Sequence, residues 1–147
     1  MPVHLVVFVA ILFYLSPLSA SDLVREQQIA AQVEAAILIG KPLRLRSGNT
    51  EFLAIHLPAR KTRMRGGVLL LHDRGMHPDW PGVLHPLRSR LPDHGWDTLS
   101  LQMPLASPDA PAGAEPALIP EAVPRIAVGV AFLRQRGIDT IAIIGHG

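Results

Sequence analysis

The sequence of 147 residues contains no cysteine. This absence excludes disulfide bonds, catalysis by a thiolate and zinc sites built on cysteine ligands. Aromatic residues are also scarce, and the two tryptophans, Trp80 and Trp96, form no series on which bases of a single-stranded nucleic acid would stack. The excess of one sign of charge is small too, because 14 Lys and Arg residues stand against 12 Asp and Glu residues and leave a formal net charge of +2. We therefore predict no nucleic-acid partner, and the sequence identifies no other partner.

What remains is the composition of a globular protein. Hydrophobic residues make up 48% of the chain and charged residues 18%, without a long polar tract. A chain of this length corresponds to one domain at most, and it can bury a core.

Charged side chains are missing from the first twenty residues. Their apolar run, residues 5–15, is shorter than the roughly 20 residues that span a bilayer as a helix. It is typical of a secretory signal, with Ala20 before the cleaved bond. We predict a signal peptide at residues 1–20 and a protein exported to the periplasm, where it has a possible association with the cell envelope. Because no Lys or Arg precedes the apolar run, anchoring in the membrane by residues 5–15 is the alternative.

The next residues predict a helix and then a β-hairpin. Residues 21–40 have helical periodicity, with Ser21 as N-cap and Leu23, Ala30, Val33 and Ile37 on one face. From residue 41 a domain extends to residue 147, and it opens with two alternating segments, PLRLR and EFLAIHL, joined by the turn residues SGNT. Within the second segment we interpret His56 as an edge or surface histidine.

The rest of the domain alternates strands with helices. GGVLLLHD predicts a strand buried on both faces, residues 81–91 a helix ended by Gly95, and WDTLSLQMP another strand. Residues 104–124 are rich in proline and predict a long loop over the ends of the strands. A helix over residues 121–136 and a strand over residues 140–144 complete an α/β fold, a mostly parallel sheet with helices on both faces.

One basic cluster, ARKTRMR at residues 59–65, lies between two predicted strands. The favoured interpretation is a solvated loop, and the alternative is contact with phosphate or anionic lipid.

The order of the predicted strands and helices, together with the motifs at the strand ends, resembles the α/β-hydrolase superfamily. The chain follows the first half of that fold: a hairpin, a strand ending in His72-Asp73-Arg74-Gly75, a helix, a strand, a long loop, a helix, and a strand ending in Gly145-His146-Gly147. More narrowly, EFLAIHL with the segment from GGVLLLHD to LQMP is similar to a bacterial family in that superfamily, the domain of unknown function 3530 family. The resemblance covers residues 25–147 and implies the N-terminal half of an α/β-hydrolase fold.

The resemblance also indicates where a catalytic turn would lie. Active members carry Gly-x-Ser-x-Gly at the elbow after the strand, and here Gly145 and His146 match the first two positions while Gly147 stands in place of the serine. The loop at Asp73 and Arg74 corresponds to the one that supplies an oxyanion-hole N–H, although Asp73 also suits a turn or a helix cap. A triad acid and histidine would follow the elbow, so the sequence resembles a truncated part of a longer protein.

A metal site is the remaining candidate. The loop at residues 72–79 contains His72, Asp73, His77 and Asp79, and His85 and His94 follow it, but their spacing matches no zinc signature. We predict neither a metal nor a cofactor.

Two functions stay open. The first is an exported, catalytically incomplete protein that keeps the hydrolase scaffold for binding or for a structural role. The second is an esterase-like hydrolase with another nucleophile or a metal.

Overall fold

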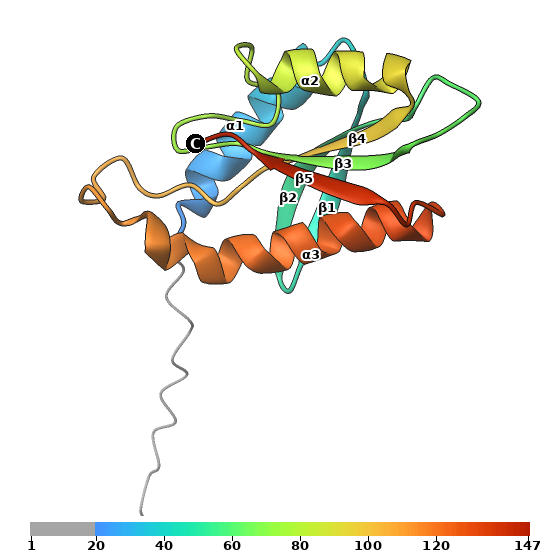
Figure 1. Cartoon of the computed structure of the whole chain (residues 1–147). Coiled ribbons are helices and arrows are strands. Elements are labelled where there is room, and N and C mark those ends of the chain that lie inside the picture. Colours follow the sequence, from blue (N-terminus) through green and yellow to red (C-terminus); the bar gives the residue numbers. More distant parts are fainter. Residues whose placement is uncertain (1–19) are drawn as a thin grey trace, which may run out of the picture.

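The computed structural model describes residues 20–147. The predicted signal segment, apart from Ala20, lies outside the described residues. Helices and strands alternate along the chain after an opening hairpin (Figure 1). In order they are α1 (Leu23–Ala36), β1 (Lys41–Ser47), β2 (Thr50–Leu57), β3 (Gly66–Leu71), α2 (Leu84–Arg90), the 3-10 helix η1 (Leu91–His94), β4 (Trp96–Leu101), the 3-10 helix η2 (Glu115–Leu118), α3 (Ile119–Gln135) and β5 (Ile141–Gly145).

The strands form one sheet in the order β1-β2-β4-β3-β5. The pairs β1–β2 and β2–β4 are antiparallel, whereas β4–β3 and β3–β5 are parallel. The predicted hairpin and parallel strands are thus confirmed, and the fold is mixed α/β. Because β3, β4 and β5 run the same way, their carboxyl ends meet at one edge of the sheet.

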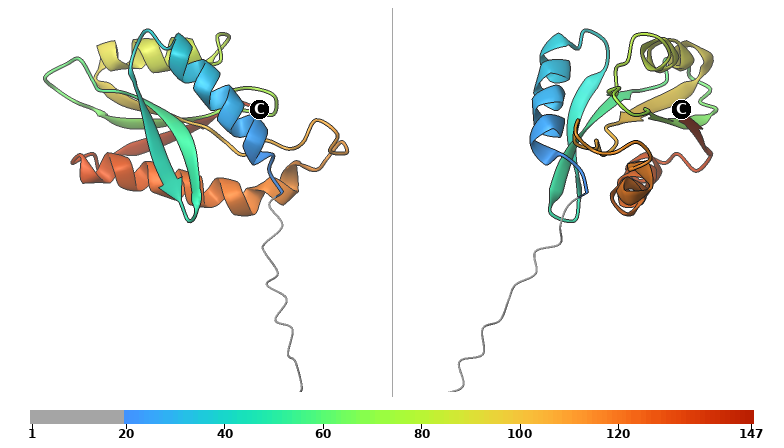
Figure 2. Two further views of the ribbon diagram at one scale, coloured as in Figure 1. Left: turned by 180° about the vertical axis from the view of Figure 1, so that it is seen from behind. Right: turned by 90° about the vertical axis from the view of Figure 1, so that its left-hand side faces the viewer.

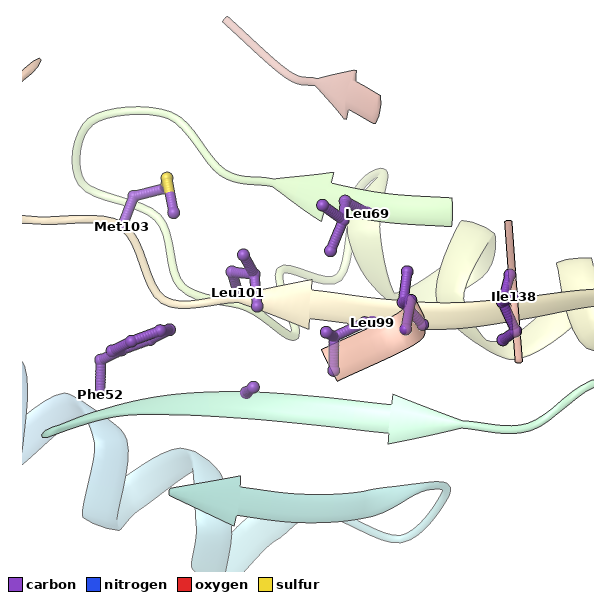
Figure 3. Packing of buried hydrophobic residues seen from close by; sticks show 8 residues of the cluster. Phe52, Leu69, Leu99, Leu101, Met103 and Ile138 are labelled. Atoms are coloured by element: carbon purple, nitrogen blue, oxygen red, sulfur yellow. The ribbon is translucent and has the colours of Figure 1, made fainter. Parts of the chain in front are cut away.

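Helices cover both faces of the sheet, as predicted, with α2 and α3 on opposite sides (Figures 1 and 2). The main core lies between the sheet and α3, where Phe52, Leu69, Leu99 and Leu101 project from neighbouring strands (Figure 3). Alternate residues of the strands face the other way, and they contact α1 through Leu53 and Ile55 and α2 through Val68 and Leu70. A strand with both faces packed is apolar throughout, as β3 is.

Helix α1 is shorter than predicted, and Ser21 is not its N-cap. The carboxylate of Asp22 accepts the N–H of Arg25 at 3.0 Å and caps the helix. Ser21 instead donates its hydroxyl to Glu121 at 2.5 Å, which links the start of α1 to α3. Serine and aspartate are both common N-cap residues, so the local sequence does not distinguish Ser21 from Asp22. The hydrogen bond from Ser21 to the distant Glu121 leaves Asp22 as the cap.

The prediction for His56 is wrong, because this histidine is buried rather than at the surface. It is 5% exposed, and its Nε2 lies 2.7 Å from a carboxylate oxygen of Asp97 on β4. The ring also meets Phe132 of α3 edge to face. A buried imidazole needs such a partner, and here the partner is 41 residues away in the chain.

Helix α3 begins at Ile119, two residues earlier than predicted, and contains Pro124 in its first turns. Together with η2 it forms a helical segment, Glu115–Gln135, that is long and apolar enough to cross a membrane by length and composition. Its inner face packs on the sheet, where a Cβ at Gly129 would lie 2.8 Å from Leu101 and 3.0 Å from Leu69.

Candidate functional site

The loops after β3 and β4 enclose a cavity of about 300 Å³ at the carboxyl edge of the sheet. The N–H of His146 donates to the carbonyl of Leu71 at 3.0 Å, so the end of β5 lies against the end of β3. Both residues predicted for the oxyanion loop, Asp73 and Arg74, line this cavity. The proline-rich segment supplies the opposite wall through residues 104–108, as expected for a loop over the strand ends.

His72 joins the two loops that form the cavity. Its Nδ1–H donates to the carbonyl of Asp73 at 2.9 Å, and its Nε2 accepts the N–H of Met103 at 2.9 Å. Both ring nitrogens are therefore used by the neutral imidazole. Burial lowers the pKa of His72 to about 4, so the ring is neutral at physiological pH. These contacts make His72 a positioning residue for the loop that carries Asp73.

Asp73 forms its turn through the backbone, because its carbonyl accepts the N–H of Met76 at 3.1 Å. Its carboxylate caps no helix and has no hydrogen bond or ion pair with the described residues. A Cβ placed on Gly147 would lie 3.8 Å from the carboxyl carbon of Asp73 and 3.9 Å from one of its oxygens. The structure thus brings the loop predicted to form the oxyanion hole close to the residues predicted as the elbow.

Gly147, in the serine position of the predicted elbow, leaves room for a side chain. Gly147 does not have a positive φ, and its Cβ would make only ordinary contacts. Neighbouring His146 keeps a buried Nδ1 without a hydrogen-bond partner among the described residues. A serine at position 147 would therefore fit beside Asp73, whereas glycine offers neither a Cβ nor a hydroxyl group there.

Two arginines complete the polar lining of the cavity. Arg74 donates to Glu115 at 2.6 Å and so connects the β3 loop to the 3-10 helix η2. Arg25 of α1 donates to the carbonyl of Ala106 at 3.3 Å. The cavity thus has a free carboxylate at Asp73 and a guanidinium at Arg25, together with apolar walls from prolines and leucines.

Behind the cavity lies a buried charge network that the sequence did not reveal. Glu26 of α1 and Arg125 of α3 approach to 2.8 Å, and both side chains are almost fully buried. Glu26 also accepts the N–H of Leu105 at 3.0 Å, and Arg125 donates to the carbonyl of Gln102 at 3.1 Å. Burial raises the pKa of Glu26, and the nearby Arg125 guanidinium offsets part of that effect. These bonds fix the loop after β4 that forms the cavity wall.

The candidate metal ligands form other contacts. The carboxylate of Asp79 accepts Arg88 at 3.0 Å and lies 2.9 Å from His85. His77 accepts the N–H of Asp79 at 3.2 Å. Among the described residues, no three His, Asp or Glu side chains are grouped so that they would hold a metal ion.

The chain matches a family model described as a protein of unknown function, DUF3530, over residues 28–127. No curated protein matches the chain. Among solved structures, a chain described as m3DLH is similar with a TM-score of 0.51 at 14% identity, over 71% of this chain and 48% of that chain. A crystal structure of a mutant of esterase rPPE is similar with a TM-score of 0.42 at 11% identity, over 89% of this chain and 43% of that chain. The chain spans about half the length of the solved structures it matches.

Proposed function

Because the chain belongs to the DUF3530 family of proteins of unknown function, we propose that it is an exported α/β-hydrolase-like protein that lacks a serine nucleophile. In this proposal residues 1–20 are a signal peptide, with anchoring by residues 5–15 as the alternative, and the periplasm is the destination. The cavity at Asp73 and Arg74 then binds a small ligand without cleaving it.

One observation carries this proposal. Gly147 stands where the sequence resemblance expects the nucleophile, and a Cβ on it would lie 3.8 Å from the Asp73 carboxyl carbon. No oxygen is present there to attack a carbonyl, and addition of a nucleophile is the first step of covalent ester hydrolysis. The volume of about 300 Å³ and the mixture of apolar walls with a few polar groups suit a small organic ligand.

Short-chain nitrophenyl esters and a fluorophosphonate probe test the proposal. We expect no ester turnover above that of the heat-unfolded protein and no covalent labelling. The Gly147→Ser variant restores the missing oxygen at a position where its Cβ clashes with nothing. Hydrolysis by the natural protein that is abolished by changes around Gly147 would refute the proposal.

The second candidate is a hydrolase with a different catalytic group, and Asp73 is the residue that favours it. Its unpaired carboxylate lines the cavity and is placed to remove a proton from a water molecule that attacks a bound carbonyl. In that case Asp73→Asn abolishes turnover of the esters, whereas Glu115→Gln, which also removes a carboxylate from the cavity lining, leaves most of it. Absence of turnover in the natural protein would exclude this candidate for these esters.

Export is tested separately. A fusion of residues 1–20 to a reporter enzyme that is active only outside the cytoplasm should be exported, and cleavage after Ala20 would distinguish a signal peptide from an anchor. Retention of the reporter in the cytoplasm would contradict the localisation.

A further inference from the structure

The basic loop, residues 59–65 between β2 and β3, lies at the opposite end of the sheet from the cavity (Figure 1). The side chains of Arg60, Lys61, Arg63 and Arg65 are exposed, which confirms that this segment is a surface loop. Its position at the amino ends of β3 and β4 makes it independent of the ligand cavity.

The basic loop is held in place by the turn before β4. The N–H of Arg60 donates to Pro92 at 3.0 Å, and the N–H of Arg65 donates to Gly95 at 2.7 Å. Gly95 has a φ of 88°, and a Cβ there would lie 2.9 Å from the carbonyl oxygen of Arg63. A glycine is thus required for this close approach, and the cationic side chains extend from a fixed backbone.

A hollow of about 520 Å³ opens beside the loop, and its lining contains no carboxylate. It is lined by Lys61, Arg63, Met64, Arg65 and His94. Asp93, which precedes the lining residue His94 in the chain, already pairs with Arg60 at 2.7 Å. Within residues 20–147, Lys61, Arg63 and Arg65 form no ion pair. The hollow is therefore a local excess of positive charge on a chain of small net charge.

We propose that this hollow binds the phosphate groups of an anionic phospholipid surface. Ammonium and guanidinium groups are the usual ligands of phosphate, and basic clusters near a bilayer are attracted by its negative potential. A membrane is favoured over a nucleic acid because Met64 is 44% exposed among the cations, where it can enter the interfacial region of a bilayer. No Phe, Tyr or Trp side chain lines the hollow, so the large rings on which successive bases usually stack are missing from it.

Co-sedimentation with vesicles tests this proposal. The purified protein is mixed at low salt with vesicles of phosphatidylcholine alone or with added phosphatidylglycerol. We expect binding only to the anionic vesicles, and a loss of binding at high salt because exposed charges are screened. The variant Lys61→Gln/Arg63→Gln should bind more weakly by roughly twenty-fold, since each basic residue contributes about five-fold near a charged bilayer.

The control Arg44→Gln/Arg46→Gln removes the same charge from β1, where both arginines pair with glutamates. Its binding should stay within about two-fold of the natural protein because these charges are already compensated. An equal loss in both variants would mean that net charge alone acts, and that result overturns the proposal. Full displacement of the vesicles by soluble glycerol phosphate, or tighter binding of a single-stranded oligonucleotide than of the vesicles, would overturn it as well.

Discussion

At the scale of single residues, His72 fixes the geometry of the candidate site. Its neutral ring bridges the β3 loop and the backbone of Met103, and protonation of Nε2 would remove the acceptor for that N–H. His77 and Arg125 lie nearby and disfavour the charged ring, whereas Asp73 favours it, but burial has the largest effect on the pKa. A buried neutral histidine of this kind couples folding to pH.

We expect the free energy of unfolding to fall as the pH drops from 6.5 to about 4. The folded pKa of His72 is about 4 and its ordinary value is 6.5, so the unfolded chain binds more protons between these values. The contribution of His72 is complete above pH 6.5 and is lost on acidification, and its upper limit is about 3 kcal/mol. Urea unfolding at several pH values measures it.

The control for this prediction is His72→Gln, because a glutamine oxygen can accept the N–H of Met103 and does not titrate. Subtracting the variant's free energy of unfolding from that of the natural protein at each pH isolates the contribution of His72. The contribution of Glu26, whose raised pKa changes stability in the opposite direction, is then removed. Identical slopes in the two proteins between pH 4 and 6.5 would contradict the prediction.

At the scale of elements, the Glu26–Arg125 ion pair links α1 and α3 at the carboxyl end of β4. The pair lies where the loop after β4 leaves the core, and both side chains also bond to that loop. Removal of one partner leaves a buried charge without compensation. We therefore expect Arg125→Met to lower the free energy of unfolding by about 3–5 kcal/mol, measured by urea denaturation.

Two comparisons make this prediction specific. In Glu26→Gln/Arg125→Met no buried charge remains, so the double variant should be more stable than Arg125→Met alone. Arg44→Gln breaks the exposed pair with Glu34 and should cost under about 1 kcal/mol. If Arg125→Met were no more destabilising than Arg44→Gln, the buried pair would not hold these elements together.

The same elements show what the sequence could and could not predict. Strands such as β3 were recognisable because a continuous apolar run that follows glycine is typical of a strand buried on both faces. Two buried pairs could not be recognised, because each joins side chains far apart in the chain. These pairs are His56 with Asp97 and Glu26 with Arg125. Glu26 lies in a helix of mixed polarity, where a carboxylate is usually exposed.

The candidate site was predicted in the same uneven way. Asp73, Arg74 and Gly147 were singled out by the resemblance to the α/β-hydrolase superfamily, and the structure brings them close together at the carboxyl ends of the parallel strands. The contribution of Arg25 from α1 was missed, because nothing in a helical segment indicates which loop it will meet. Backbone acceptors such as the carbonyl of Ala106 leave no trace in the sequence.

At the scale of the whole molecule, the polypeptide of residues 21–147 carries an apolar strand, β5, at one of the two edges of its sheet. Strand β5 pairs with β3 on one side, and no strand of the described residues pairs with its other edge. Ile143 on this strand is 52% exposed. An exposed, apolar edge strand is a template for pairing with another chain.

We therefore expect the polypeptide of residues 21–147 to associate as its concentration rises, observed by size-exclusion chromatography with light scattering. Ile143→Lys places a charge on the open edge and should reduce association strongly, because charged edge strands resist pairing. Val123→Lys is the matched control, since Val123 is 57% exposed but lies on α3, away from any strand edge. Equal effects of the two substitutions would indicate general apolar adhesion instead of strand pairing. A monomer that unfolds cooperatively without either substitution would contradict the prediction altogether.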